Sequence, residues 1–257
     1  MKKYVNVIVI ALAVAAGFTF YSLVLGNPAN FADAAKEEPI NALGMIYTGG
    51  ILVGLLVSFI ILAVVYSIER FLSINKAKGK SDPVKFIKRV TSKLEADDLD
   101  GALDECDKQR GSVANVLRAA ISRYKAVEKD DNFGPEKKIS EVQRSIDEAL
   151  NLETPLLEKN LVIISTIASI ATMVGLMGTT LGMIRAFRAL ANSGTVSATQ
   201  LSIGISEALY NTAGGLIAAV ICIVAYNFFT SKVDSFVYMI DEAILNITSI
   251  FTIKTKK

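Results

Sequence analysis

Four stretches of this chain are long and apolar enough to cross a lipid bilayer. A spanning helix needs about 20 apolar residues, because the hydrocarbon core is about 30 Å thick. Hydrophobic residues make up 52% of the 257 residues, yet 20% are charged, so membrane helices must be combined with a polar part. The sequence therefore predicts an integral membrane protein. The four stretches are Val5–Leu25, Met45–Ile68, Leu161–Ile184 and Leu201–Phe229.

The polar part lies between the second and third stretches, and its pattern is helical. Ser81-Asp82-Pro83 is typical of a helix start, with a capping side chain followed by proline at the first helical position. Apolar residues then recur at three- and four-residue spacing through this region, and no window alternates as a strand does. We therefore expect an all-α fold.

Two long helices are expected to connect the membrane and the polar part. An amphipathic pattern begins at Glu136 and runs toward the third stretch, with a kink expected at Pro155. Another amphipathic pattern, Val233–Phe251, extends the fourth stretch. The expected organisation begins with an N-terminal anchor and outer loop (1–44) and a membrane helix (45–70). A cytoplasmic helical domain (71–159), two further membrane helices (160–230) and a cytoplasmic C-terminal helix (231–257) follow.

Lysine and arginine placement predicts the topology. The connection 26–44 holds only Lys36 and the connection 189–200 holds none, whereas the charged block and both termini are rich in lysine. The termini and the block are therefore expected in the cytoplasm. The first stretch could instead be a cleaved signal peptide, with a cleavage site near Ala32–Ala34. A retained helix is favoured, because about 21 apolar residues exceed the usual signal core.

The third and fourth stretches each carry a stripe of small and polar residues on one helix face. Such stripes usually allow close helix packing in lipid, and threonine can also bond to its own helix carbonyls. The residues that we expect to pack helices are Gly175, Gly178, Gly182, Gly214 and Gly215. The polar residues of the two faces are Thr179, Glu207, Asn211 and, at the edge of its stripe, Thr212.

Glu207 is the exceptional residue, because a carboxylate in a membrane is costly unless it faces a cavity or a partner. It has a function, makes a specific buried contact, or lies near the outer interface. The last three stretches offer no other mid-membrane acid, lysine or histidine; Glu69, Arg70, Arg185 and Arg188 are interpreted as interface flanks. A proton pump needs a series of titratable groups, so a further titratable group is expected from another subunit.

Several classes of protein are disfavoured. The chain has no histidine and two cysteines in different regions, Cys106 and Cys222. We find no nucleophile–base pair, phosphate loop or metal-ligand cluster, so no enzyme, cofactor or metal site is expected. Nucleic-acid binding would need a basic patch interleaved with aromatic residues, and the sequence shows none. A secondary transporter is the alternative, although matching broken helices are not seen.

Two segments, ATMVGLMGTTLGMIRAF (171–187) and GISEALYNTAGGLIAAVICIVAYN (204–227), resemble the signature helices of the MotA/TolQ/ExbB proton channel family. IERF (68–71) and GALDECDKQRGSVANVLRAAISR (101–123) extend the resemblance. Prolines of the family pattern are replaced by Thr172 and Ile221, so both helices are expected to be straighter.

The resemblance implies an ExbB-type subunit of a proton-driven motor in the bacterial inner membrane, with TolQ-like or gliding-type stators as alternatives. It implies a pentamer whose last two helices line a pore around ExbD-like single helices. A partner aspartate would carry the protons, and a TonB-like protein would receive the work. Carried over, the pore residues are Thr179, Thr212 and Glu207, to which we add Asn211 as a hydrating group. Lipid is the remaining expected partner.

Overall fold

The computed structural model describes residues 4–36, 38–130, 132–192 and 198–255. Within these residues the chain is helical, and its only β-type pairing is an isolated bridge between Phe31 and Pro39. The predicted all-α fold is confirmed. The chain divides into two compact units, Met1–Ile68 with Asn160–Asn227 and Glu69–Lys159 with Phe228–Lys257.

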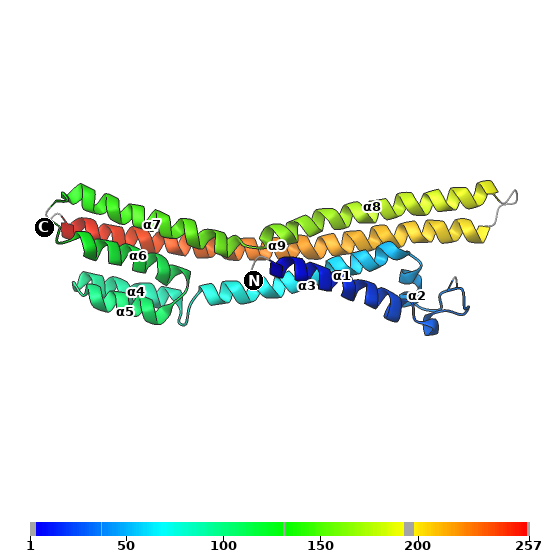
Figure 1. Cartoon of the computed structure of the whole chain (residues 1–257), viewed down its shortest axis with the longest axis horizontal. Coiled ribbons are helices and arrows are strands. Elements are labelled where there is room, and N and C mark those ends of the chain that lie inside the picture. Colours follow the sequence, from blue (N-terminus) through cyan, green and yellow to red (C-terminus); the bar gives the residue numbers. More distant parts are fainter. Residues whose placement is uncertain (1–3, 37, 131, 193–197, 256–257) are drawn as a thin grey trace. The chain divides into compact units, whose positions relative to one another are not determined.

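The first unit holds the apolar helices (Figure 1). Among the residues that the structure describes, four helical spans are long and apolar enough to cross a membrane, as predicted. The elements that contribute to this unit are α1 (Val5–Phe20) with a π-helical turn (Tyr21–Leu25), a 3-10 turn (Pro28–Asn30), α2 (Ala42–Tyr47), the start of α3 (Ile51–Ala77), α8 (Leu161–Asn192) and the start of α9 (Ala198–Thr255).

Helices α1 and α3 touch through small residues. A Cβ atom added to Gly17 would lie 2.8 Å from the backbone nitrogen of Ser58, and one added to Gly54 would lie 3.0 Å from the Phe18 ring. The Ser58 hydroxyl donates to the carbonyl of Gly54 at 2.7 Å within its own helix. The helix expected from the first apolar stretch therefore packs against the second along backbone surfaces.

Hydropathy predicts that the second apolar stretch is one helix from Met45, and this prediction is wrong. Met45 belongs to α2, and α3 begins only at Ile51, after a turn at Gly49–Gly50. Gly50 has φ +78°, a left-handed conformation that glycine adopts without a Cβ penalty. Hydropathy alone does not predict this turn, because glycine does not lower the mean hydropathy of an apolar segment enough to mark a helix end.

Helices α8 and α9 pack in antiparallel orientation with their backbones in contact. A Cβ atom on Gly215 would lie 2.7 Å from the carbonyl oxygen of Ala171, and one on Gly182 would lie 2.7 Å from that of Gly204. A Cβ atom on Gly175 would lie 3.1 Å from Cα of Gly215. The glycine stripes thus form the contact between these two helices.

The second unit contains α4 (Pro83–Glu95), α5 (Leu99–Gln109), α6 (Ser112–Val127), α7 (Pro135–Glu158) and the end of α9. The predicted cap at Asp82 is confirmed, because its side chain accepts from the backbone N–H groups of Val84 and Lys85. The core is built from the apolar positions of each amphipathic pattern, among them Phe86, Val90, Leu117, Ile121, Val142, Ile146 and Phe251.

The two long helices end differently from each other. The predicted extension of the fourth stretch is confirmed, because α9 is continuous to Thr255, and the Phe251 ring stacks on Tyr124 at 4.0 Å. Helix α7 continues through Pro155, where a kink was expected, and ends at Glu158. The path between α7 and α8 is interrupted at Asn160, whose φ is +64°. Asparagine tolerates this conformation better than most residues.

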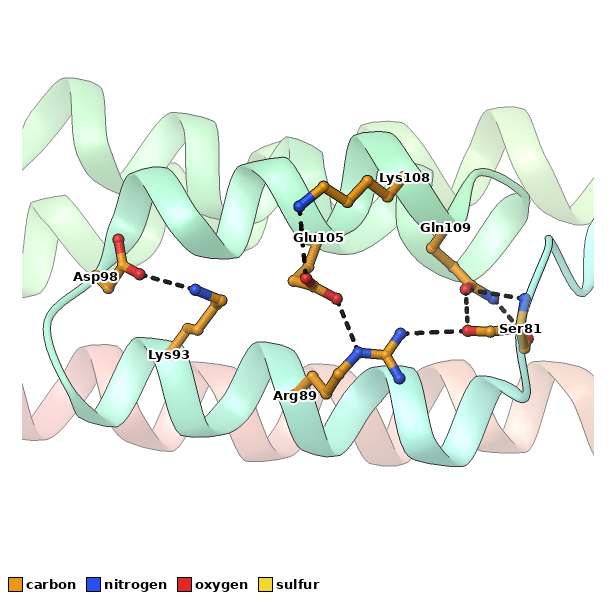
Figure 2. A network of polar contacts seen from close by, with 7 residues as sticks. All are labelled: Ser81, Arg89, Lys93, Asp98, Glu105, Lys108 and Gln109. Atoms are coloured by element: carbon orange, nitrogen blue, oxygen red, sulfur yellow. Dashed lines mark hydrogen bonds and ion pairs between the residues drawn. The ribbon is translucent and has the colours of Figure 1, made fainter.

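A polar network joins α4 and α5 on the surface of the second unit (Figure 2). Arg89 donates to Glu105 at 2.8 Å and to the Ser81 hydroxyl at 3.2 Å. Gln109, which is only 3% exposed, donates to the carbonyls of Lys78 at 2.9 Å and Ser81 at 2.8 Å. Gln109 therefore fixes the turn that follows α3.

Candidate functional site

The candidate site lies in the first unit, where α8 and α9 meet the turn before α3. Glu207 is 7% exposed there, and Arg185 on α8 donates from Nη1 to its Oε1 atom. A Cβ atom on Gly50 would lie 2.8 Å from the same carboxylate oxygen. Glycine at this position therefore satisfies both the positive φ and the close approach of the carboxylate.

Asn211 lies one helical turn after Glu207 and is fully buried. Its Nδ2 atom donates to the carbonyl of Gly49 at 2.6 Å and to that of Glu207 at 3.0 Å. Its Oδ1 atom is buried and has no hydrogen-bond partner in the described part of the chain. Gly178 makes room for this side chain, since a Cβ atom there would lie 2.2 Å from Cβ of Asn211. Asn211 thus ties α9 to the turn before α3.

The hydroxyls of Thr179 and Thr212 lie 2.5 Å apart, and either can be the donor. Each also lies 3.3 Å from the carbonyl oxygen of Gly175. Both side chains are half-buried. The small residues of the helix contact allow this approach, because a pair of hydroxyls on neighbouring helices can meet only where the backbones are close.

The structure therefore sorts the predicted polar residues into two groups. Thr179 and Thr212 pair with each other between α8 and α9. Glu207 and Asn211 are enclosed by the chain itself, against Arg185 and the Gly49–Gly50 turn.

The other residues interpreted as interface flanks are Arg188, which is exposed, and Glu69 and Arg70, which form a pair. Arg188 is exposed on α8. Arg70, in the second unit, is 1% exposed; it donates from Nε and Nη2 to the carboxylate of Glu69 at 2.7 and 2.6 Å. Its Nη1 atom donates to the carbonyl of Leu157, near the end of α7, at 3.1 Å. The guanidinium thus satisfies a terminal helix carbonyl.

Sequence reasoning missed two features of the site. It interpreted Arg185 as a flank and did not anticipate its ion pair with Glu207. It also gave no role to the Gly49–Gly50 turn. A Gly-Gly pair that interrupts an apolar stretch is the signal that could have found the turn.

The groups available for chemistry at the site are the hydroxyls of Thr179 and Thr212 and the carboxylate of Glu207, whose charge is compensated by Arg185. Residues 51–68, 161–184 and 201–227 contain no ionisable acid or base other than Glu207, Tyr66, Tyr210, Cys222 and Tyr226. The described residues also contain no group of three or more His, Cys, Asp or Glu side chains that could hold a metal ion. The hydroxyl pair can donate to and accept from a carboxyl group, but it cannot store a proton by itself.

A model of the MotA/TolQ/ExbB proton channel family matches residues 108–242, more than half of the chain. The chain belongs to this family. The matched region includes Thr179, Arg185, Glu207 and Thr212 and leaves α1 outside it.

Individual members of the MotA/TolQ/ExbB family resemble the chain over shorter segments. The Tol-Pal system protein TolQ of Pseudomonas aeruginosa is 32% identical over 120 residues, which cover 47% of this chain and 52% of that protein. TolQ of Haemophilus influenzae is 36% identical over 115 residues, 45% of this chain and 49% of that protein. The biopolymer transport protein ExbB of Aquifex aeolicus is 43% identical over 77 residues, 30% of this chain and 52% of that protein. The chain spans about half the length of these curated relatives.

Proposed function

We propose that the chain is the pore-forming subunit of a proton-driven motor of the ExbB or TolQ type in the bacterial inner membrane. Several copies, five in the expected assembly, would surround single-helix partners of the ExbD or TolR type. The observation that carries this proposal is the Thr179–Thr212 hydroxyl pair, 2.5 Å apart, in apolar spans (161–184 and 201–227) whose only carboxylate is Glu207.

A hydroxyl pair needs a titratable group beside it to move protons. A partner aspartate would supply that group, since a carboxyl that gains and loses a proton must exchange hydrogen bonds each time. Thr179 and Thr212 can accept from the protonated form and donate to the ionised form. The chain itself needs no cofactor, metal or catalytic step for this role.

Glu207 has a different role in the proposal. Its carboxylate is buried and paired with Arg185, so its charge is already compensated. Together with Asn211 it holds α9 against the Gly49–Gly50 turn. Glu207 would therefore position the hydroxyl of Thr212, about 1.4 helical turns away, and would not itself carry the proton.

Within the family, we assign the chain to the ExbB branch in preference to the TolQ branch. It rests on the additional helix α1 and on the similarity of residues in α8 and α9 to the ExbB and TolQ pattern. In this branch a TonB-like protein would receive the work, and both termini would lie in the cytoplasm with α1 retained. The relatives include both TolQ and ExbB proteins, so a TolR-type partner is the second candidate.

The experiment that tests the proposal is purification of the tagged chain in mild detergent, with mass spectrometry of the proteins that co-purify. Recovery of a small single-helix protein with a membrane aspartate, together with a TonB-like protein, is the expected result. A TolR-type partner would support the mechanism and assign the chain to the TolQ branch. A chain that purifies without any such single-helix partner would contradict the proposal and favour a secondary transporter.

A further inference from the structure

A cavity of about 220 Å³ lies in the second unit between the end of α3 and the part of α9 that follows residue 227. Its walls combine aromatic and basic side chains. Phe71 and Phe228 are 56% and 52% exposed, whereas Phe229 is buried. The cavity is lined by Phe71, Ile74, Asn75, Lys78, Phe228, Phe229 and Lys232.

The apolar stretches of α3 and α9 end at this cavity. Phe71 follows the end of the second apolar stretch, at Ile68, by three residues, and Phe229 is the last residue of the fourth stretch. Charged residues begin directly after these points, at Glu69 and Lys232. Because aromatic and basic residues gather where a helix leaves the hydrocarbon, the cavity lies at the edge of the membrane.

The charge of the cavity is positive and uncompensated. Lys78 and Lys232 are exposed, and neither forms an ion pair with a carboxylate of the described residues. The Lys232 ammonium lies 5.7 Å from the centre of the Phe228 ring. No acidic residue lines the cavity. An anion would therefore be attracted to it, and an apolar chain could contact the phenylalanine rings.

The position of Lys78 is fixed by the second unit. Its carbonyl accepts from Nε2 of Gln109 at 2.9 Å, and Gln109 also holds Ser81, as Figure 2 shows. The backbone N–H of Lys78 donates to the carbonyl of Ile74 at 3.2 Å. The base of the Lys78 side chain is thus held at the cavity, while its ammonium group remains free to reach a ligand.

We propose that this cavity binds the headgroup of an anionic phospholipid from the membrane leaflet that it borders. Lys78 and Lys232 pair with the phosphate, Asn75 can donate to a headgroup oxygen, and Phe71 and Phe228 contact the first carbons of the acyl chains. Basic pockets beside membrane helices bind anionic headgroups in this manner, and aromatic side chains favour the same depth. The site is separate from the threonine pair, so it does not depend on the proposed function.

The proposal is tested by native mass spectrometry of the full chain in mild detergent, titrated with phosphatidylglycerol or with phosphatidylcholine of the same acyl chains. The test variant is Lys78→Gln/Lys232→Gln. The matched control is Lys85→Gln/Lys88→Gln, which removes the same charge from exposed lysines of α4. Wild type and control are expected to prefer phosphatidylglycerol, and the test variant to lose that preference by on the order of tenfold.

Each alternative result has a defined meaning. An equal preference in the test and control variants would overturn the site, and so would an equal loss in both, since that would indicate a general charge effect. Inorganic phosphate is expected not to displace the lipid, because it cannot contact the phenylalanine rings. Displacement by phosphate would indicate a free-phosphate site and would overturn the lipid assignment.

Discussion

Arg185 and Glu207 form an ion pair between α8 and α9, although the two side chains are exposed to very different degrees. The Glu207 side chain is 9% exposed and that of Arg185 is 58% exposed. The carboxylate is thus held inside the helix contact by a guanidinium that reaches it from outside. This geometry makes Arg185 the partner that allows a charged residue at this buried position.

Removing either member of this pair is expected to destabilise the protein. Arg185→Gln leaves a buried carboxylate uncompensated, and Glu207→Gln leaves the guanidinium without its acceptor. The expected loss is on the order of 2 kcal/mol for each variant, between the values for exposed and buried pairs. The double variant should lose less than the sum of the single variants, because the charges disappear together.

Thermal unfolding in mild detergent, followed by circular dichroism, measures this coupling. Arg188→Gln is the control, since Arg188 is exposed and makes no ion pair with the described residues. Strictly additive losses in the double variant would show that Arg185 and Glu207 are energetically independent.

The hydroxyl pair gives a prediction about proton transport. Thr179→Val and Thr212→Val are each expected to lower partner-dependent proton flux by about tenfold or more, since each removes a hydrogen-bonding group worth about 1–2 kcal/mol. Flux is measured with a pH-sensitive dye in proteoliposomes that contain the chain and its partner. Insertion should be unaffected.

Thr180→Val is the matched control for this prediction. Thr180 is the next residue on α8, but it is exposed, and its hydroxyl donates to the carbonyl of Met177 at 2.8 Å. Thr212→Ser retains the hydroxyl and should retain the flux. If Thr179→Val and Thr180→Val behave alike, the hydroxyl pair is not part of the path.

Two adjacent glycines of α9 are expected to differ in their tolerance of a methyl group. In Gly215→Ala the new Cβ would lie 2.7 Å from the carbonyl oxygen of Ala171 and 2.8 Å from Cα of Gly175. Backbone atoms cannot move away easily, so a loss of about 1–3 kcal/mol is expected. Gly214→Ala meets only the end of the Leu56 side chain, at 3.2 Å, and should be tolerated. Thermal unfolding of both variants decides, and equal losses would contradict the described helix contact.

Acid is expected to weaken the contact between α4 and α5. The Arg89 guanidinium, which donates to Glu105, lowers the pKa of that carboxyl below its ordinary value (Figure 2). A lowered folded-state pKa contributes stability above the unfolded value of about 4.3, and this stability is lost as pH falls through the folded pKa.

Glu105→Gln should therefore lower the free energy of unfolding near neutral pH by less than about 1 kcal/mol, since the pair is partly exposed. The difference from wild type should shrink as the pH falls below about 4.3, the unfolded value, and disappear once the pH is below the lowered pKa of Glu105 in the folded protein. Thermal unfolding across this pH range measures it, with the exposed Glu95→Gln as control. A difference that stays constant into acid would exclude a contribution from the carboxylate.

Most of the helices could be predicted from the sequence, because their signals are local. Apolar length indicates a membrane helix, and three- and four-residue spacing gives the buried positions of α4, such as Phe86, Val90 and Leu94. The cap at Asp82 is equally local, since it depends on residues next to it in the chain. The end of the long helix at Glu158 was less predictable, because Pro155 carries a stronger breaking signal than Asn160.

The sequence by itself determined that small and polar residues share one face of α8 and one face of α9. Only the tertiary structure decided which of them meet: Thr179 with Thr212, Arg185 with Glu207, and Asn211 with the carbonyl of Gly49. Helical periodicity relates residues a few positions apart and gives each one a direction. The partner at the end of that direction comes from another helix, and its identity depends on how closely the glycines allow the backbones to approach.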